Sequence, residues 1–342
     1  MKNRLVFLYP ITAILIILTA VLFCLNMLKN AGIAKKQKEE IAKQEESEKD
    51  LIEYKSNQTI RVKFTKTGQV VAMDMNDYIR GVLPSEMPPS YNIEALKAQA
   101  LVARTYTYKR MEDGAEGDEC DICDDYKHCQ AFYTKEKIFE IWKGRGFDEE
   151  TRNKYWRKVN EAVVATQTQA IVYDGKYIKA FFHASSPDET ENIDQIWGGE
   201  KLPYLVSVKS SESEEYLNRT SIVEEEFSSF IEKLKTNIKI SEIFEEDVKK
   251  ICINEITTSG RVKNILVGQN IISAEKLRVI YGLKSTKFTI EIKDKSIVFH
   301  VTGNGHGIGL SQVGADTLAN QGQNYEQIIK HYYKGVDIKT FK

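Results

Sequence analysis

The most hydrophobic part of the chain lies at its amino terminus, where residues 5–28 form a nearly uninterrupted apolar run. Such a run is long enough to span a bilayer as a helix. Lys2 and Arg4 precede it and no A-x-A-like cleavage site closes it, so residues 1–28 are predicted to be an uncleaved signal anchor. A buried core helix is the disfavoured alternative, because the run stands at the terminus. The lysines at 29–38 outnumber the basic residues before the run, so charge alone does not favour a cytoplasmic amino terminus.

Residues 29–58 are dominated by Lys, Glu and Gln and contain few large apolar residues. This composition predicts a charged stalk, either disordered or a marginal helix with i,i+4 ion pairs. The folded region is predicted to begin near Thr59. Apolar and polar residues alternate over 60–64 and return over 70–75 after a Thr67-Gly68 turn, which predicts a hairpin.

A proline-rich corner and a long helix follow. Because Pro84, Pro88 and Pro89 fix φ and remove backbone donors, residues 85–89 are predicted to form a rigid turn that presents Glu86 on a loop. The next helix is predicted to start after Ser90 or Asn92 as its cap. Its positions 93, 96, 100, 103 and 107 form an apolar face, and a neighbouring stripe carries Lys97, Leu101, Arg104 and Tyr108. This stripe is predicted to place cations beside Glu86.

The remaining pattern predicts further short helices and strands. A hairpin is expected over 170–173 and 177–183 around Asp174-Gly175, and helices over 149–166, 222–234 and 274–283, the last closed by Gly282. Strands are expected at 253–258, 262–267, 287–292 and 296–302. Because sheets and helices are segregated rather than alternating, the fold class of the region over 59–342 is predicted to be α+β. Residues 210–254 are expected to be a variable insertion.

Composition excludes one class of function. The chain has 342 residues with a formal net charge of -1, and its basic and acidic residues are interspersed. A nucleic-acid-binding protein would carry a basic patch. No nucleic-acid partner is therefore expected.

Thiol and imidazole side chains cluster after the long helix, at Cys120, Cys123, His128 and Cys129. These are preferred zinc ligands, and four of them closing a tetrahedron would make a structural zinc site. A disulfide is the main alternative, because an exported domain meets oxidising conditions. Three clustered cysteines leave one thiol over, which favours the metal. Cys252 is expected to be a buried thiol, and Cys24 belongs to the predicted membrane helix.

Three separated segments resemble the stage II sporulation protein D family. Residues 81–110 carry its E-M-P corner followed by an E-A-L-K-A-Q-A-x-x-A-R-T-Y helix. Residues 181–199 follow its F-x-H-S-T-S-G-G-x-T-E and W-G-G pattern, except that Pro187 and Asp188 stand where glycines are usual. Residues 301–315 follow its G-x-G-x-G-H-G-x-G-M-S-Q-x-G-A pattern, with Val301 and Leu310 as departures.

The resemblance implies a peptidoglycan lytic transglycosylase of sporulation engulfment. It implies Glu86 as the catalytic acid, zinc at a C-x4-H-C-Q run, and a membrane complex with stage II sporulation proteins P, an amidase, and M. It also implies a single-pass membrane protein with a cytoplasmic amino terminus and an extracytoplasmic catalytic region over 59–342 that has a central groove. The residues expected to bind substrate are Lys97, Arg104, His183, Ser185, His306, Ser311 and Gln312.

Other interpretations stay open at this point. Glu86 taken alone is typical of a solvated loop residue, and a histidine at a strand end, such as His183, is more often structural than catalytic. A muramidase-type hydrolase would need a second carboxylate near Glu86, from Asp188, Glu191 or Asp194. A wall-binding activator of an amidase would need none. A catalytic zinc is disfavoured, because four ligands leave no open position for water.

Overall fold

The computed structural model describes residues 58–114, 119–212 and 220–341, together with residues 54–56 and the isolated residues 27 and 38. The predicted membrane anchor (1–28) and stalk (29–58) fall almost entirely outside this part of the chain and stay predictions. Among the described residues, no helix combines the length and the apolar character needed to cross a membrane.

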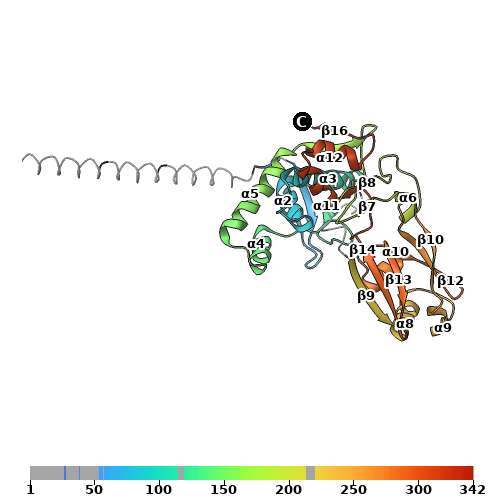
Figure 1. The fold of residues 1–342 in the computed structure, drawn as a ribbon. Helices are drawn as coiled ribbons and strands as arrows, with labels where there is room; N and C mark the ends of the chain where they lie inside the picture. Colours follow the sequence, from blue (N-terminus) through green and yellow to red (C-terminus); the bar gives the residue numbers. More distant parts are fainter. Residues whose placement is uncertain are drawn as a thin grey trace, which may run out of the picture. The chain divides into compact units, whose positions relative to one another are not determined.

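The described chain consists of strands and helices that follow one another in short runs, coloured from blue to red along the sequence in Figure 1. The elements up to residue 210 are β1 (Thr59–Lys63), β2 (Val70–Asp74), α2 (Met75–Glu86), α3 (Ile93–Asp113), β3 (Ile122–Cys123), α4 (Lys135–Gly144), α5 (Glu149–Ala165), β4 (Gln169–Tyr173), β5 (Lys176–Tyr177), β6 (Phe182–His183), β7 (Asp188–Glu189), α6 (Ile193–Ile196) and β8 (Lys209–Ser210).

The elements after residue 219 are β9 (Thr220–Glu226), α8 (Phe227–Asn237), α9 (Glu245–Val248), β10 (Cys252–Ile256), β11 (Val262–Val267), β12 (Asn270–Ser273), α10 (Ala274–Tyr281), β13 (Phe288–Ile292), β14 (Ser296–Thr302), β15 (Leu310–Ser311), α11 (Gln312–Asn320), α12 (Tyr325–Tyr332) and β16 (Asp337–Thr340). The strands form small sheets in the orders β2-β1-β3, β16-β4-β5, β13-β14-β9 and β10-β11-β12, and the pairs β15-β6 and β7-β8. The described chain is thus a mixed α and β structure.

The first hydrophobic core surrounds α3, which contacts α2, α5, β4, α11 and α12. The Asn92 side chain caps this helix by accepting a hydrogen bond from the Glu94 backbone N–H, as the sequence predicts, and Gly114 ends it in the left-handed conformation. Small side chains such as Ala98 and Ala103 let the neighbouring elements pack closely on most sides. The predicted polar stripe is wrong beyond Lys97, because Arg104 is fully buried.

The corner that carries Glu86 differs from the prediction. Helix α2 continues through Pro84 to Glu86, so the acid is the last residue of a helix and not part of a loop. A proline removes only its own N–H and leaves later bonds possible, and here the Met87 N–H bonds to the Leu83 carbonyl. The turn begins only at Met87. The helix therefore fixes the direction of the Glu86 side chain more firmly than a loop would.

A second hydrophobic core lies between α8, α10 and the sheets β13-β14-β9 and β10-β11-β12. The strands predicted at 253–258, 262–267, 287–292 and 296–302 are confirmed as β10, β11, β13 and β14, and Gly282 caps α10 with φ 64°. The helix predicted over 222–234 is wrong in its first turns. Residues 220–226 form β9, which pairs antiparallel with β14 along its whole length, and the helix begins only at Phe227. Pairing with the buried strand β14 overrides the local helical pattern.

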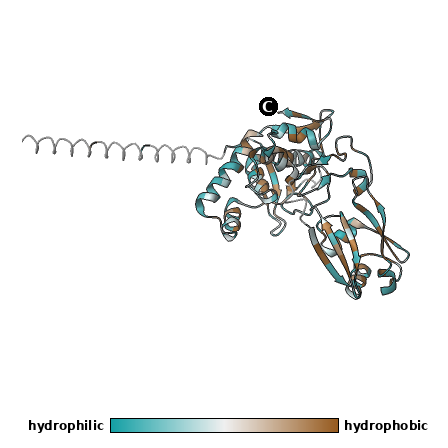
Figure 2. Cartoon of the chain, viewed as in Figure 1, coloured by the Kyte–Doolittle hydropathy of each residue, from teal (hydrophilic) through white to brown (hydrophobic). Residues whose placement is uncertain are grey.

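Burial follows the predicted pattern elsewhere in the chain, with one exception. Trp156, Val159, Ala162 and Val163 of α5 face the core as expected, whereas much of the rest of this helix is hydrophilic (Figure 2). The hairpin β4–β5 closes at Asp174-Gly175, with Val172 opposite Tyr177. The prediction that Cys252 is buried is wrong, because this residue is exposed at the start of β10, which lies at the edge of its sheet.

Candidate active site

Two segments more than a hundred residues apart in sequence lie side by side. Strand β6 pairs in parallel with β15, so His183 lies opposite Ser311, and a bridge joins Ser185 to Asn304. The glycine-rich loop over 303–309 makes this close approach possible. A side chain at Gly309 would begin 2.0 Å from the Phe181 carbonyl oxygen, in a backbone with φ 72°. The left-handed backbone at Gly309 thus allows the loop to pack closely against the segment that contains Phe181.

Glu86 lies beside this junction at the end of α2. Its Oε1 accepts a hydrogen bond of 2.7 Å from the Ala131 backbone N–H. Burial raises the pKa of Glu86 above its ordinary value, and the bond from Ala131 opposes that shift only in part. A carboxyl group with a raised pKa holds its proton longer as pH rises, which is what a general acid requires.

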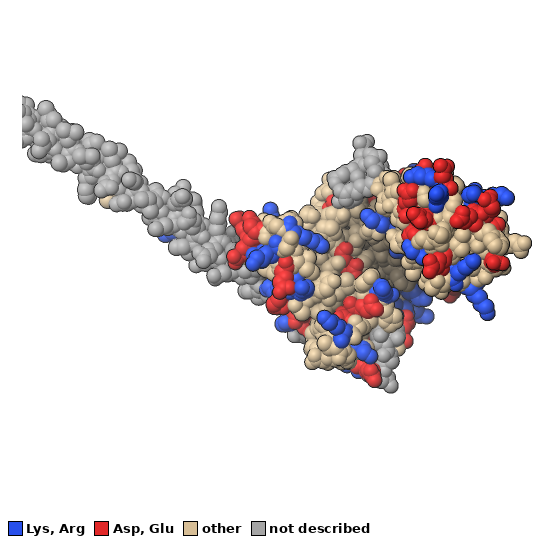
Figure 3. Space-filling view, turned by 90° about the horizontal axis from the view of Figure 1, so that it is seen from below, with Lys and Arg blue, Asp and Glu red and all other residues tan. Residues whose placement is uncertain are grey.

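Two cavities adjoin at Glu86. One has a volume of about 330 Å³ and the other about 400 Å³, and Glu86, Ala184 and Gln312 line both. Among the described residues, Glu86 is the only carboxylate in either wall. The space-filling view shows a hollow in the surface of the described chain, with basic and acidic side chains interspersed around it (Figure 3). Cavities of this size accommodate small ligands or single sugar rings.

The expected cationic partners of Glu86 lie elsewhere. Lys97 pairs with Glu94 at 2.8 Å on its own helix. Arg104 is buried in the first core, where it donates to the Asn76 side chain at 2.9 Å and to the Val163 carbonyl oxygen. Neither residue lines the cavities at Glu86. The prediction of a cationic stripe beside the acid is therefore wrong, because α3 is enclosed where an exposed face was expected.

His183 is a buried, neutral residue with a defined tautomer. Burial, together with the neighbouring His306 ring and the Arg261 charge, lowers its pKa well below the ordinary value. Its Nδ1 lies 3.2 Å from the Ile308 carbonyl oxygen, which only accepts, so Nδ1 carries the proton. Its Nε2 then accepts from the Ser186 hydroxyl at 2.6 Å. His183 thus joins the two segments and also lines the larger cavity.

Ser185 and Ser311 share a buried carboxylate, that of Glu212. The Ser185 hydroxyl donates to Glu212 at 2.6 Å, the Ser311 hydroxyl at 2.7 Å and the Ser186 backbone N–H at 2.6 Å. Ser311 is fully buried and also caps α11, whereas Ser185 lines the smaller cavity. In this arrangement both hydroxyls stabilise the junction rather than point at a ligand.

His306 and Gln312 complete the predicted set. The His306 ring lies 5.7 Å from the His183 ring, and its Nδ1 accepts from the Ile308 backbone N–H at 3.0 Å. Burial lowers the pKa of His306 to about 3, so the ring is neutral. Both residues line the larger cavity. Of the predicted substrate-binding residues, the structure therefore gathers His183, Ser185, His306 and Gln312 at the cavities, with Ser311 beneath them.

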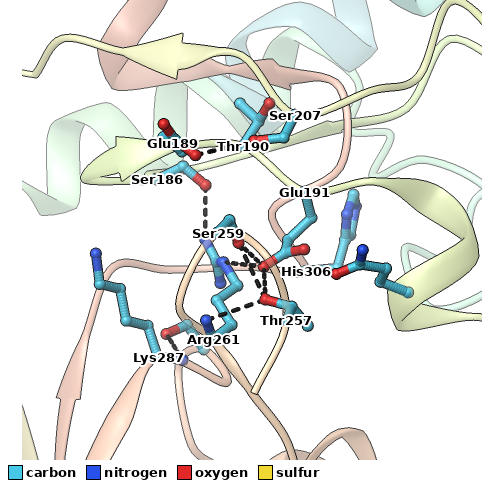
Figure 4. A network of polar contacts seen from close by, with 12 residues as sticks. Ser186, Glu189, Thr190, Glu191, Ser207, Thr257, Ser259, Arg261, Lys287 and His306 are labelled. Atoms are coloured by element: carbon cyan, nitrogen blue, oxygen red, sulfur yellow. Dashed lines mark hydrogen bonds and ion pairs between the residues drawn. The ribbon is translucent and has the colours of Figure 1, made fainter.

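A buried ion pair supports the junction from the second core. Arg261, at 1% exposure, lies with its Nε 3.6 Å from Glu191, whose exposure is 0%. Its Nη2 donates to the Ser186 hydroxyl at 2.6 Å, and Thr257 and Ser259 donate to Glu191. Figure 4 shows the guanidinium between Ser186 and Glu191. Arg261 thereby holds the hydroxyl that fixes the His183 tautomer.

The carboxylates suggested as a second catalytic acid are engaged elsewhere. Glu191 belongs to the buried ion pair, Asp188 pairs with Lys287, and Asp194 lies 3.9 Å from Lys201. None of the three lines a cavity with Glu86. Asp188 has φ 76°, so it takes the left-handed backbone for which the family pattern uses glycine.

Three of the four predicted metal ligands converge. The Cys123 and Cys129 sulfurs are 3.1 Å apart, and the His128 Nδ1 lies 3.5 Å and 3.7 Å from them. Ligands of one tetrahedral zinc are spaced by about 3.3–3.8 Å, so both histidine–sulfur distances fit a zinc ion. The two sulfurs are slightly closer together than that spacing and too far apart for a disulfide. Cys120 is buried nearby, but its sulfur is not in the converging group. His128 and Cys129 line the larger cavity.

The sequence did not point to Glu212 or Arg261. Glu212 stands in a charged stretch beside many similar residues, and Arg261 follows a Ser-Gly turn at the start of a strand. Only long-range contacts identify them. Glu191 alone of these buried charges belongs to one of the family motifs.

Comparison with known proteins identifies relatives over most of the chain. A family model described as stage II sporulation protein matches residues 63–173. The chain is 32% identical over 280 residues to stage II sporulation protein D of Bacillus amyloliquefaciens, covering 80% of this chain and 76% of that protein. It is 30% identical to the protein of the same name in Bacillus subtilis over 82% of this chain and 78% of the relative. It is also 26% identical to a B. subtilis protein named amidase enhancer, over 77% of this chain and 40% of that protein.

Proposed function

Because the chain belongs to the stage II sporulation protein D family, we propose that it is a lytic transglycosylase that cleaves peptidoglycan glycan strands. The bond cleaved joins N-acetylmuramic acid to N-acetylglucosamine, and the product is a 1,6-anhydro-muramoyl end. The supporting observation is a single carboxyl group, Glu86, with a raised pKa at the edge of two adjoining cavities.

One carboxyl group suffices for this reaction. Glu86 gives its proton to the glycosidic oxygen as the bond from that oxygen to C1 breaks. The resulting carboxylate takes the proton of the muramoyl 6-hydroxyl, whose oxygen forms the new bond to C1. No water is consumed and Glu86 ends as it began. Hydrolysis would require a second carboxylate for water or for a covalent intermediate, and none of the described residues lining the cavities supplies one.

The neighbouring residues prepare this step. The Ala131 N–H holds one Glu86 oxygen at 2.7 Å and thereby fixes the carboxyl group where it lines the two cavities. His183 and His306 are neutral, so neither ring draws the proton from Glu86. Gln312 lines both cavities and offers an amide to the strand on either side of the scissile bond.

We extend the proposal to location, role and partners. The apolar run at 5–28 would anchor the protein in the cell membrane, with a cytoplasmic amino terminus and the catalytic region outside. The family name supports a role in sporulation, and the resemblance of the motifs suggests engulfment. The same resemblance suggests stage II sporulation proteins P and M as partners.

The experiment that tests the proposal is mass spectrometry of purified glycan strands after incubation with the full-length protein. We expect anhydro-muramoyl ends to accumulate. New reducing ends would instead identify a hydrolase whose second carboxylate comes from outside the two cavity walls. Absence of any cleavage product would contradict the enzymatic proposal.

A second candidate function is supported by the relative named amidase enhancer. In this role the protein would bind the wall and activate an amidase without cleaving glycan itself. The same incubation distinguishes the two functions when a cell-wall amidase is included. Faster peptide release without anhydro-muramoyl ends would favour the activator.

We also propose that Cys123, His128 and Cys129 hold a structural zinc ion, with Cys120 as the candidate fourth ligand. Two further hydrogen bonds would stabilise Cys129 as a thiolate, because the Cys123 backbone N–H and the Arg110 guanidinium both donate to its sulfur. A bound zinc would supply a rigid cross-link between β3 and the loop that follows it, beside the larger cavity.

Removal of the metal is expected to destabilise the protein. Treatment with a strong chelator should lower the melting temperature, and added zinc should restore it, because ligand binding to the folded state adds to its stability. Calorimetry on freshly purified protein measures the shift, and Cys252→Ser, which removes an exposed thiol outside the cluster, should show the same shift. Elemental analysis that finds no zinc in fresh protein would contradict the proposal.

A further inference from the structure

The smaller cavity contains a cation that no motif pointed to. Lys284 lies between α10 and β13 in the second core region and lines the same cavity as Glu86. Among the described residues, it is the only positively charged side chain in that wall. The polar groups that accompany it are those of Ser185, Thr220, Ser221, Asn304 and Gln312.

The main chain of Lys284 is fixed from two sides. Its carbonyl oxygen accepts a hydrogen bond of 2.7 Å from the Gly305 backbone N–H and one of 3.4 Å from the Arg278 side chain. The next residue, Ser285, donates its hydroxyl to the Thr302 carbonyl oxygen. Lys284 is thus attached to the glycine-rich loop that carries His306, and it cannot drift from the cavity as a lysine on a free loop would.

The ammonium group of Lys284 is available to a ligand. The side chain is exposed and makes no hydrogen bond or ion pair with any described residue. Most other lysines near the cavities are engaged: Lys287 pairs with Asp188, and Lys127, in the larger cavity, lies over the Tyr126 ring. An unpaired cation in the wall of a cavity favours an anionic group in the molecule that fills it.

The proposed substrate carries such a group on one of its two sugars. Every muramoyl residue bears a lactyl ether with a carboxyl group, which is either free or extended by a stem peptide that has carboxylates of its own. N-acetylglucosamine bears none. A strand that runs through both cavities has its scissile bond at Glu86, where the cavities adjoin, so its two sugars occupy one cavity each.

We propose that Lys284 binds a carboxylate of the muramoyl residue and thereby directs this sugar into the smaller cavity. The inference rests on the proposed glycan substrate and gives Lys284 the part that the sequence suggested for Lys97 and Arg104. It also assigns a function to the second core region, which supplies Thr220, Ser221 and Lys284 to the binding site. The direction in which the glycan strand binds is then set by charge, since only one orientation pairs the muramoyl carboxylate with Lys284.

Direct binding measurements test the inference without requiring turnover. Full-length protein carrying Glu86→Gln serves as the parent, and Lys284→Met is added to remove the charge while keeping the length of the side chain. Three ligands are compared: glycan strands stripped of peptides, the same strands after their carboxyl groups are converted to amides, and strands that retain stem peptides. Lys276→Met, which removes an exposed lysine of α10 outside both cavities, is the control.

We expect Lys284→Met to weaken binding of carboxylate-bearing strands about tenfold, the usual contribution of a charge-assisted hydrogen bond. Binding of the amidated strands should not change, Lys284→Arg should retain most of the affinity, and the Lys276 control should match the parent. A loss seen with stripped strands identifies the lactyl carboxylate, and a loss seen only with peptide-bearing strands identifies the stem peptide.

Other outcomes would overturn the inference. Equal affinities of parent and Lys284→Met for every strand would do so, as would an equal loss for amidated and unmodified strands, or a parent that binds no strand. Failure of the proposed enzymatic function would give a different experimental result. In that case wild-type protein yields no anhydro-muramoyl ends, while the dependence of binding on Lys284 and on carboxylates persists.

Discussion

Replacing Glu86 by glutamine is expected to lower the rate of glycan-strand cleavage by about 100-fold or more, because a positioned general acid contributes about 10²–10⁴ to rate. Glutamine has the size of the native side chain and keeps an oxygen that accepts from the Ala131 N–H. Folding and glycan binding should therefore persist. The measurement is the initial rate at which anhydro-muramoyl ends form, compared at equal protein concentration and saturating strands. Near-native rates in the variant would exclude Glu86 as the acid.

The pH dependence of wild-type cleavage should also reflect the protonation of Glu86. The acid must be protonated at the start of the reaction, so the rate should fall as pH rises through the raised pKa of Glu86. The residual rate of Glu86→Gln should lack this decline. Glu161→Gln, which alters an exposed carboxylate of α5, serves as the control and should keep both the rate and the decline.

Glu86→Gln, which is expected to lower activity, should raise the stability of the folded protein at pH values above the pKa of Glu86. A carboxyl group whose pKa is higher in the folded than in the unfolded state weakens folding as pH rises from the unfolded to the folded value. The glutamine variant avoids that loss. Its free energy of unfolding should therefore equal that of wild type in acid and exceed it above the raised pKa, because glutamine carries no charge that burial would penalise.

Local patterns predicted those parts of the fold that depend on neighbouring residues. The cap at Asn92, the Asp174-Gly175 hairpin and the Gly282 helix end each follow from backbone preferences of one or two residues. The convergence of Cys123, His128 and Cys129 likewise needs only a short bent loop. Such local features are present in the folded protein because the tertiary contacts agree with the local backbone preferences.

The errors arise where distant parts of the chain decide the outcome. An amphipathic pattern indicates an exposed stripe on α3, but elements from both ends of the fold enclose the helix and bury Arg104. The local pattern of β9 favours a helix, whereas its partner β14 follows only after several intervening elements and cannot be inferred from neighbouring residues. Three prolines suggest a loop at Glu86, yet α2 tolerates Pro84 near its end.

The residues that support the site could not be predicted from the sequence, because they too depend on contacts between distant parts of the chain. Glu212, Arg261 and Lys284 come from segments outside the family motifs, and each acts across a long sequence separation. A motif shows which residues recur near the chemistry. The side chains that orient them, and the cation available to a substrate, become visible only when the second core is placed against the first.

Removing the buried cation of the junction is expected to have the largest effect on stability. Arg261→Met should lower the free energy of unfolding by about 3–5 kcal/mol, because it leaves the Glu191 carboxylate buried without its partner. Ser186 also loses a donor, and with it the anchor of the hydroxyl that bonds to His183. Urea unfolding followed by circular dichroism measures the change. Lys263→Met, which removes an exposed cation of β11, should cost about 1 kcal/mol or less.

The pH dependence and a double variant identify the ion pair as the cause. Burial raises the pKa of Glu191 above its ordinary value, and the Ser259 and Thr257 hydroxyls and the Arg261 charge oppose that rise. Without Arg261, Glu191 therefore takes up a proton at higher pH. The deficit of Arg261→Met should therefore shrink in acid, where Glu191 is neutral, and grow as pH rises. Adding Glu191→Gln should recover part of the lost stability, because no unpaired charge then remains buried. A deficit that is independent of pH and unchanged in the double variant would mean that Arg261 contributes by packing alone.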